Sequence, residues 1–476
     1  MEATQKTARR KMREVREIER LEKERSRPKG HGYAYYLLLI LCVVYITDEI
    51  ATAIGGQMQS VIAQAIFAPV FGAEMAVARM SALTMISLLG AGLAFLYKPL
   101  SDRFGRKFFL VTNTFGMGLS LLLISLSTNI PVYLLGGFFT TFFVQHDMQV
   151  VYIIETAPAK HRGKVYSMIK AVATMGIMLI PVLRNIFIST DISGWRMVYM
   201  IPAIVGMIVS GLALMFARET DAFIMARLAY LRMSDEERAA AKKGKSERAS
   251  QGGLISGIKF CFRHKQLRWI LLSGAFVMWG MMLTSYYETT MTYGYASKFL
   301  SQGMALEEAK QRALPFVTSA LFLFPVGSAL LQFVQGFISD KWGRKAAAVI
   351  LSASALCSFL LFFFGANNNW APYLVGFLSG AAVGSFWGAM DACSVITTES
   401  TPTNLRTSVL TVTPMISGVL YGFVMNLALI LINAYGDAYV GIISVAIAAP
   451  GLFIGLMILI FKVKETRGTD INTVGE

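Results

Sequence analysis

Charged residues are scarce in this chain of 476 residues. Asp, Glu, Lys and Arg make up 15% of it, against about 25% in ordinary soluble domains, and 55% of the residues are apolar. A water-soluble fold cannot bury that much apolar surface in its core. The composition therefore excludes an ordinary globular protein and predicts one that lies in a membrane.

Common catalytic and metal-binding motifs are absent from the sequence. It has no P-loop, no G-x-S-x-G at a strand and no H-E-x-x-H. The four cysteines have no spacing suited to zinc, so we expect free thiols: Cys42, Cys261, Cys357 and Cys393. We expect a protein that is not an enzyme, has no cofactor and no metal site, and is not driven directly by ATP.

The polar segments are short. Residues 1–29 lack the apolar core of a signal peptide and are rich in Arg, Lys and Glu, which predicts a solvated, partly helical arm. The arm could also bind lipid or regulate. Residues 218–266 are expected to form a linker, with a surface helix over 233–253 that Ser234 caps. Neither segment is long enough for a folded signalling domain, which argues against a membrane sensor.

Long apolar segments fill the rest of the chain. Segments of about 20 apolar residues can cross a hydrocarbon core roughly 30 Å thick. They begin near Tyr33, Val77, Phe108, Pro131, Val165, Arg196, Leu267, Ala313, Ala346, Pro372, Thr407 and Ala438. We predict an all-α membrane protein of twelve transmembrane helices, six within residues 30–217 and six within 267–463, followed by a tail at 464–476.

The two halves repeat each other. The string SDRFGRK at 101–107 returns as SDKWGRK at 339–345, 238 positions later. Two further landmarks recur at offsets of 244 and 246, namely E-x-x-P-x-x-x-R at 155–162 and 399–406, and a basic residue followed by Glu-Thr at 218–220 and 464–466. A nearly constant offset between several landmarks indicates an internal duplication, which predicts two pseudo-symmetric halves.

The basic residues predict the orientation in the membrane. Both SD-x-x-GRK loops, residues 160–164, the stretch 218–268 and the N-terminal arm lie on one side, which the positive-inside rule assigns to the cytoplasm. Both termini are therefore expected there. The net charge of +15 follows from this topology and from attraction to anionic lipid, so no nucleic-acid partner is needed.

These motifs together resemble the major facilitator superfamily, and within it the branch of sugar porters and organic-ion porters, or metabolite:proton symporters. The KETRG string at 464–468 adds to the likeness, which covers nearly the whole chain beyond residue 30. The resemblance implies a monomeric secondary transporter of the cell membrane, inner or plasma. Its two halves rock about a central site, moving a small molecule and protons.

The resemblance also implies a cytoplasmic gate of ion pairs that hold the halves together when that side is shut. We assign it to Asp102, Arg106, Glu155, Arg162, Asp340, Arg344, Glu399 and Arg406. Asp102 and Asp340 can accept from free N–H groups at helix starts, and the Arg-Lys pairs can face Glu155, Glu219, Glu399 and Glu465. The alternative is that the charges only fix the topology.

Ionisable residues inside the apolar spans are the candidates for substrate binding or proton coupling, because a charge there is costly. They are Asp48 and Glu49 in the first span, His146 and Asp147 in the fourth, Arg184 in the fifth, Glu288 in the seventh and Asp391 in the tenth. The resemblance implies that spans one, four, seven and ten line the cavity. Glu49 could instead mark a helix end, and His146 could be structural.

Aromatic residues accompany these carboxylates. Trp279, Tyr287 and Trp387 are candidates for the cavity wall, and Trp387 shares a helix face with Asp391, an arrangement suited to holding a cation. Any of these rings could equally serve packing. Arg184 is expected to pair with Asp48 or Asp191. Sugar porters pair an aspartate of the first helix with an arginine of the fourth, where this chain has Leu135.

Four carboxylates from two halves favour an organic cation or amine as substrate, exchanged with or carried beside protons. Three alternatives stay open. A neutral sugar or an organic anion could bind through Arg184 or through amides, namely Gln57, Gln149, Gln332, Gln335 and Asn426. Carboxylates with His146 and methionines could carry a divalent metal. A non-transporting sensor is the last alternative.

Overall fold

The computed structural model describes residues 2–26, 33–97, 100–144, 152, 155, 162–188, 191–234, 236–238, 240, 254–401 and 406–467. Regular structure within them is helical throughout. His146, Asp147 and Gln149 lie outside the described residues, as do the side chains of Asp102, Arg162 and Arg406.

The first half contains six spans in chain order. They are α2 (Tyr33–Gln57); α5 (Ala76–Thr84) with η2 (Met85–Ser87) and α6 (Leu88–Tyr97); α8 (Arg106–Ser125); α9 (Ile130–Val144); α11 (Arg162–Gly176) with α12 (Leu179–Phe187); and α13 (Trp195–Phe216). Short connecting helices are α3 (Gln59–Ile62), η1 (Ala63–Phe67), α4 (Ala68–Phe71), α7 (Ser101–Phe104) and η4 (Ile192–Gly194).

The second half repeats this order. Its spans are α17 (Lys265–Val277) with η5 (Met278–Gly280) and α18 (Met281–Leu300); α19 (Leu306–Trp342); α20 (Arg344–Asn367); α21 (Pro372–Glu399); α22 (Arg406–Tyr435) and, after η6 (Asp437–Tyr439), α23 (Val440–Lys462). Among the described residues, eleven helical segments are long and apolar enough to cross a membrane, and α9 is a shorter apolar helix. This agrees with the twelve expected spans.

One boundary was predicted wrongly. The sequence placed the start of the eighth span near Ala313, but α18 continues to Leu300 and α19 begins at Leu306, so the mixed-charge stretch 298–312 is largely helical. Glu307 and Glu308 occupy the first turn of α19, where the helix dipole favours acidic side chains. A helix can project beyond the hydrocarbon layer, so charged residues do not have to end it.

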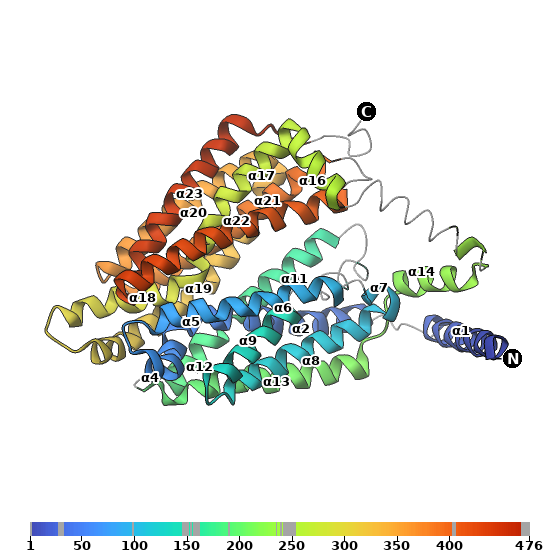
Figure 1. Cartoon of the computed structure of the whole chain (residues 1–476), viewed down its shortest axis with the longest axis horizontal. Helices are drawn as coiled ribbons and strands as arrows, with labels where there is room; N and C mark the ends of the chain where they lie inside the picture. The colour runs from blue at the N-terminus through green and yellow to red at the C-terminus, as the bar shows by residue number, and fades with distance from the viewer. Residues whose placement is uncertain are drawn as a thin grey trace.

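Figure 1 shows the two halves as separate bundles that run along the long axis of the molecule, the first in blue to green and the second in yellow-green to red. Both repeated strings, at 101–107 and 339–345, lie at one end, here called the basic end. The halves diverge toward it and meet at the opposite end near α5 and α18 (Figure 1). The opposite end, with residues 59–78 and 301–310, is called the closed end.

Glycines bring α19 and α21 into close contact. Gly376, Gly380 and Gly384 recur every fourth residue along one face of α21. A Cβ atom at these positions would lie 1.7, 1.9 and 2.4 Å from backbone carbonyl oxygens of α19. Only glycine permits such an approach, a device that is common between membrane helices. The pair α19 and α21 therefore forms a tight unit that carries several of the candidate site residues.

The linker contains a helix that was not expected, α14 (Asp221–Arg232), which Thr220 caps by accepting from the Phe223 N–H at 3.3 Å. Ser234 and Glu237 then form a reciprocal capping box, with N–H to side-chain distances of 2.7 and 3.1 Å. This confirms Ser234 as a cap. Described residues beyond it resume at α16 (Leu254–Arg263).

The N-terminal arm is a helix, α1 (Glu2–Ser26), and one of its faces is buried rather than solvated. Leu21 is 1% exposed and packs with Ile224, Leu228 and Leu231 of α14. Three ion pairs surround this contact: Glu14 with Arg238, Glu17 with Arg227 and Glu22 with Arg232, at 3.1, 2.8 and 2.6 Å. The arm and the linker therefore form one unit at the basic end.

Candidate functional site

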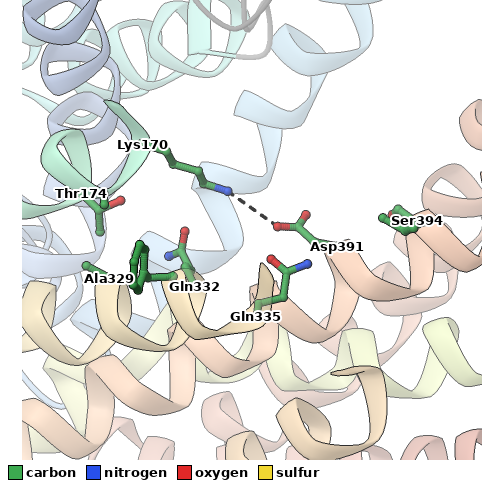
Figure 2. Close-up of a pocket in the computed structure, with 10 residues that line it drawn as sticks. Lys170, Thr174, Ala329, Gln332, Gln335, Asp391 and Ser394 are labelled. Carbon is green, nitrogen blue, oxygen red and sulfur yellow. Dashed lines mark ion pairs between the residues drawn. The ribbon is translucent and has the colours of Figure 1, made fainter. Parts of the chain in front are cut away.

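A cavity of about 380 Å³ lies between the two halves. It is lined by Lys170, Ala171 and Thr174 of α11 and by Ala329, Gln332, Phe333, Gln335, Asp391, Ser394 and Val395 of α19 and α21. Each half thus contributes to its wall. Lys170 and Asp391 face each other across it (Figure 2), with 3.6 Å between Nζ and Oδ2.

Among the described residues that line this pocket, one is a cation and one is an anion. The side chains of Lys170 and Asp391 are 26% and 49% exposed, so both remain in contact with water. Gln332 donates to Ser328 Oγ at 3.0 Å, and Gln335 presents a second amide on the same helix (Figure 2). Amides and hydroxyls can both donate and accept hydrogen bonds. The pocket therefore offers one ion pair and several neutral polar groups to a ligand.

The repeated string of the first half forms a polar network at the basic end. The carboxylate of Glu219 accepts hydrogen bonds from the backbone N–H groups of Arg106 and Lys107 at 2.9 and 3.2 Å. The Arg106 guanidinium lies 3.1 Å from Glu155 Oε1 and donates to Ser101 Oγ at 3.2 Å. The helix start of α8 is thus held by acids from two other parts of this half.

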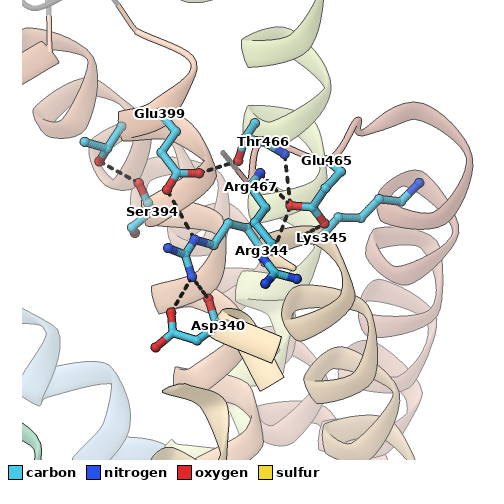
Figure 3. A network of polar contacts seen from close by, with 10 residues as sticks. Asp340, Arg344, Lys345, Ser394, Glu399, Glu465, Thr466 and Arg467 are labelled. Atoms are coloured by element: carbon cyan, nitrogen blue, oxygen red, sulfur yellow. Dashed lines mark hydrogen bonds and ion pairs between the residues drawn. The ribbon is translucent and has the colours of Figure 1, made fainter. Parts of the chain in front are cut away.

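The second half builds the same network (Figure 3). Arg344 pairs with Glu399 at 3.2 Å, and Glu465 accepts from the backbone N–H groups of Arg344 and Lys345 at 2.8 and 3.1 Å. Asp340 adds a further ion pair to Arg344 at 2.8 Å. In each half a threonine, Thr220 or Thr466, donates to the paired glutamate at 2.5 or 2.6 Å.

Burial distinguishes the two equivalent glutamates. Glu219 is covered by its neighbours, and desolvation raises its pKa above 4.5 despite three backbone N–H donors. Burial also acts on Glu465, but the backbone N–H groups of Arg467, Arg344, Thr466 and Lys345 outweigh it and lower the pKa. The same motif is therefore set in two electrostatic environments.

A second group of polar contacts joins the halves near the closed end. Arg184 of α12 and Glu288 of α18 are both fully buried and lie 3.2 Å apart. Glu288 also accepts from the N–H and the hydroxyl of Ser60 at 2.8 and 2.6 Å. Arg184 donates to the carbonyl of Gln57 and to Thr318 Oγ1, the latter at 3.4 Å. A buried ion pair with further hydrogen bonds thus connects the halves.

Asp437 makes another contact between the halves. It is 1% exposed, and its carboxylate accepts from the backbone N–H groups of Val77 and Ala78 at 2.6 and 2.8 Å, at the start of α5. Its own N–H donates to the Glu74 carbonyl at 2.9 Å. Lys310 of α19 donates to the Ala73 carbonyl at 3.2 Å. The second half therefore caps a helix of the first.

The family model described as Major Facilitator Superfamily matches residues 49–413. The chain belongs to the major facilitator superfamily. Among this superfamily's solved structures, a D-xylose–proton symporter aligns with a TM-score of 0.61 at 16% identity, covering 92% of this chain and 99% of that one. The inward-open xylose transporter XylE from E. coli gives 0.60 at 16% identity, over 93% and 99%.

A bacterial homologue of the human lysosomal transporter Spinster, inward-facing and unoccupied, gives a TM-score of 0.53 at 15% identity, over 91% of this chain and 96% of that one. Identities this low show the common fold alone. They confirm the predicted all-helical transporter fold, and the superfamily confirms a multi-pass membrane transporter that is not an enzyme.

Curated superfamily members match only in part. An uncharacterised MFS-type transporter of Bacillus subtilis, YfkF, is 42% identical over 66 residues, which are 13% of this chain and 16% of that protein. The glucose transporter GlcP of Staphylococcus epidermidis is 28% identical over 118 residues, 24% and 25% of the two chains. The matched stretches thus span a quarter or less of either relative.

Within this superfamily fold, the candidate carboxylates that the structure describes do not share one chamber. Glu288 lies in the buried contact near the closed end, whereas Asp391 lies in the pocket. Asp48 is buried and Glu49 half-buried in α2, each with an interaction partner, and neither lines the pocket. The partner expected for Arg184 was Asp48 or Asp191, but Arg184 pairs with Glu288.

The predicted aromatic residues serve packing. Tyr287 stacks on Phe324 with 4.5 Å between ring centroids. Trp279 lies against Gly451, whose added Cβ would be 2.6 Å from that of Trp279. Trp387 is 38% exposed and contacts Phe386 edge to face, and it does not line the pocket beside Asp391. The expected cation site between a ring and a carboxylate is therefore not formed there.

The gate motifs behave differently from the expectation. Arg106 with Glu155, and Arg344 with Asp340 and Glu399, are confirmed as ion pairs, but each network lies within one half. In this conformation they brace each half and do not join the two. Helix starts are capped by the glutamates of the Glu-Thr motif, at 219 and 465, a role that was assigned to the aspartates of the repeated string.

Two of the alternative substrates were a neutral sugar, bound through amides, and a divalent metal ion. Of the amides proposed for a sugar, Gln332 and Gln335 line the pocket, Gln57 is buried in the Arg184 contact, and Asn426 is exposed on α22. Within the described part of the chain, no three His, Cys, Asp or Glu side chains form a cluster that could hold a metal ion.

Proposed function

We propose that this superfamily member is a proton-coupled symporter of a small neutral polyhydroxylated solute, such as a monosaccharide, which binds in the pocket between α11, α19 and α21. The observation that carries this proposal is the composition of the pocket wall. It combines a balanced Lys170–Asp391 pair with the amides of Gln332 and Gln335 and the hydroxyls of Thr174 and Ser394.

A sugar needs such a wall. Each hydroxyl of a sugar donates one hydrogen bond and accepts others, and amide side chains satisfy both demands. A charged pair can also bond to hydroxyls without attracting ions of one sign, because its two charges cancel at a distance. A site built to bond hydroxyls discriminates strongly against analogues that lack them, since its polar groups are then left unpaired.

The structure supports an organic cation or amine as substrate less well than the sequence did. That proposal needs carboxylates with uncompensated charge in one water-filled chamber. Here Asp391 is paired with Lys170, and Glu288 is paired with Arg184 away from the pocket. An organic anion would need a cation with uncompensated charge, and Lys170 is already paired with Asp391.

The comparisons add support for a sugar. GlcP, which matches this chain locally, is a glucose transporter, and the structure with a similar overall fold is a D-xylose–proton symporter, so both support a sugar and the second supports coupling to protons. Neither likeness is close enough to carry the substrate by itself. The pocket chemistry and the relatives nevertheless agree.

We place the basic end in the cytoplasm and the protein in the plasma membrane. The repeated Arg-Lys pairs at that end satisfy the positive-inside rule. The halves are joined by buried contacts at the closed end, so this conformation is open toward the cytoplasm. The two basic-end networks then brace the halves as rigid bodies, and closing that side requires new contacts between them.

Counterflow into proteoliposomes tests the substrate. Vesicles preloaded with one unlabelled solute should take up its labelled form if it is a substrate. We expect counterflow with monosaccharides, stimulated by an inward proton gradient, and none with amines, quaternary ammonium ions or carboxylates. Counterflow with amines alone would overturn the proposal.

Variants locate the site. Gln332→Ala and Gln335→Ala should each raise KM about tenfold or more, since each removes hydrogen bonds to substrate hydroxyls. Asn367→Ala, an exposed amide at the far end of α20, is the matched control and should leave KM unchanged. An unchanged KM in both pocket variants would place the substrate elsewhere.

A further inference from the structure

We propose that Glu288 binds the transported proton, and that its ionised form, bound to Arg184, locks the two halves together near the closed end. This inference rests on the proposed proton coupling but not on the identity of the solute. It separates the proton site from the solute pocket. Arg184 lies 14 residues beyond Lys170, or about 20 Å along the helix direction.

The geometry is that of a lock between the halves. Glu288 belongs to α18 of the second half, and the donors that hold it belong to the first half. These donors are the Arg184 guanidinium at 3.2 Å, the Ser60 N–H at 2.8 Å and the Ser60 hydroxyl at 2.6 Å. Both carboxylate oxygens are occupied. Separation of the halves at this end has to break all three contacts together.

The charges of Arg184 and Glu288 are compensated by each other and not by solvent. Arg184 and Glu288 are each 0% exposed, so water cannot compensate either charge in this conformation. Arg184 is the cation that faces Glu288, from α12. Tyr199 of α13 and Tyr287 of α18 are the phenols that face the pair. The elements α3 and α19 contribute the uncharged Ser60 and Thr318.

Protonation and opening are therefore coupled. When the halves part, Arg184 and Ser60 move away with the first half and leave the carboxylate on the second. An uncompensated charge in an apolar wall is strongly unfavourable, and binding a proton removes it. The open form of this end thus favours the neutral acid, and the closed form favours the ion pair. By linkage, acidity must then favour opening, to the same extent that opening favours proton binding.

The transport cycle follows from this linkage. In the orientation proposed above, the closed end faces outside, so Glu288 takes up a proton from the outer solution when that end opens. During closure, before the contact is sealed, the O–H bond of the neutral acid breaks, a water molecule on the pocket side takes the proton, and the carboxylate re-forms its pair with Arg184. One proton is then carried inward in each cycle.

Two other acids fit this role less well. Asp391 is 49% exposed in the pocket and its partner Lys170 is 26% exposed, so separating these two charges costs less than separating a fully buried pair. Asp437 also joins the halves, but its partners are backbone N–H groups, which carry no net charge. Lys310 is the nearby cation, but it donates to the Ala73 carbonyl, so Asp437 acts mainly as a helix cap that strengthens the closed end.

The first test measures conformation without any solute. Spin labels at Val70 and Ser301, exposed positions on opposite halves at the closed end, are introduced after the four cysteines are replaced by serine. On acidification from about pH 8 to about pH 5, the distance distribution should shift from short to long. Glu288→Gln, a neutral isostere of the protonated acid, should give the long distances at every pH.

The matched control is Glu308→Gln, an exposed acid at the closed end that pairs with Arg312 on its own helix. It should keep the pH response of the parent protein. A parent protein whose distances ignore pH would overturn the proposal. So would a Glu288→Gln variant that stays closed or responds to pH as the parent does.

Ser60→Ala provides a milder second variant should Glu288→Gln not fold. It removes one donor from the ionised, closed form, so opening should need less acid. The midpoint of the distance change should move up by about one pH unit, the shift that loss of a hydrogen bond to a charged group implies. A midpoint that stays in place or moves down would contradict the lock.

The second test measures accumulation driven by a proton gradient. Glu288→Gln should lose this accumulation, so that the internal solute concentration does not exceed the external one, whereas Glu308→Gln should accumulate solute as the parent protein does. Accumulation by Glu288→Gln at the level of the parent protein would overturn the proton assignment. If the parent protein shows no counterflow with any sugar, the proposed solute fails, but the distance measurement still decides the lock.

Discussion

The carboxylate of Asp437 lies 2.6 Å from the backbone nitrogen of Val77, 360 positions earlier in the chain. One half of the transporter thus caps a helix that belongs to the other. An acidic group at a helix start satisfies free N–H groups and the helix dipole, and here it does so only while the closed end is shut.

Replacing Asp437 by Ala should weaken the closed end. Loss of a buried helix cap is expected to lower the free energy of unfolding by about 2 kcal/mol, which thermal unfolding in detergent can measure. A cysteine placed at Val77 should also become more reactive to a polar maleimide, because the lost contact favours opening.

Asp191→Asn is the control for this change, since Asp191 lies in an exposed loop of the first half near the closed end. It should alter neither property. An Asp437→Ala variant with the melting temperature and thiol reactivity of the parent would show that the cap contributes nothing to the closed conformation.

Gly105→Ala and Gly343→Ala should each disrupt a basic-end network. Both glycines have positive φ, 106° and 111°, and an added Cβ would lie 2.1 and 2.3 Å from the carboxylates of Glu219 and Glu465. The left-handed backbone alone costs a side chain about 1 kcal/mol, and displacement of the carboxylate adds the loss of two helix-start hydrogen bonds.

Gly303→Ala separates these two effects. Gly303 has φ 86°, but a Cβ there meets nothing within 4 Å. It should show the backbone cost alone, so the melting temperature should fall less than in the other two variants. Equal losses in all three would mean that the contact with the glutamate has no energetic consequence.

The two glutamates of the Glu-Thr motif should show opposite pH dependence. The raised pKa of Glu219 means that its contribution to stability is present at low pH and is lost as the pH rises from 4.5 through the raised value. The lowered pKa of Glu465 means that its contribution is present above 4.5 and is lost as the pH falls through the lowered value.

Glutamine at each position removes the titration. As the pH rises from about 3 to about 7, Glu219→Gln should gain melting temperature relative to the parent protein, while Glu465→Gln should lose it. Parallel curves for the two variants would contradict the difference in burial to which we attribute the opposite shifts.

Leu21→Asp should release α1 from α14. Leu21 is 1% exposed in the contact with Ile224 and Leu228, and burial of a carboxylate there without a partner is unfavourable. Limited trypsin digestion should then cut the arm at its Lys and Arg residues well before the parent protein is cut. Val15→Asp, at an exposed position of the same helix, should digest like the parent.

The repeated strings predicted more of the structure than any other feature of the sequence. Because each string places Arg and Lys at a helix start, and a glutamate motif recurs at a similar offset, the pairs Arg106–Glu155 and Arg344–Glu399 could be expected. Their confinement to one half could not be, since it depends on how far apart the halves stand in this conformation.

The closed-end contacts were mostly missed for the same reason. Glu288 and Arg184 were recognised as costly charges inside apolar spans, but their pairing joins different halves, and nothing in their spacing specifies it. Asp437 follows a glycine in a short turn, where an acidic residue is unremarkable. Asp437 caps α5 only because the second half lies against the first at this end.

The three glycines at 376, 380 and 384 have a consequence for how cargo is handled. Because they press α21 against the backbone of α19, the amides at 332 and 335 and the carboxylate at 391 belong to one tightly packed pair of helices. In the site that we propose, we expect a solute bound to this pair to leave only when α11, with its lysine, moves away as a unit.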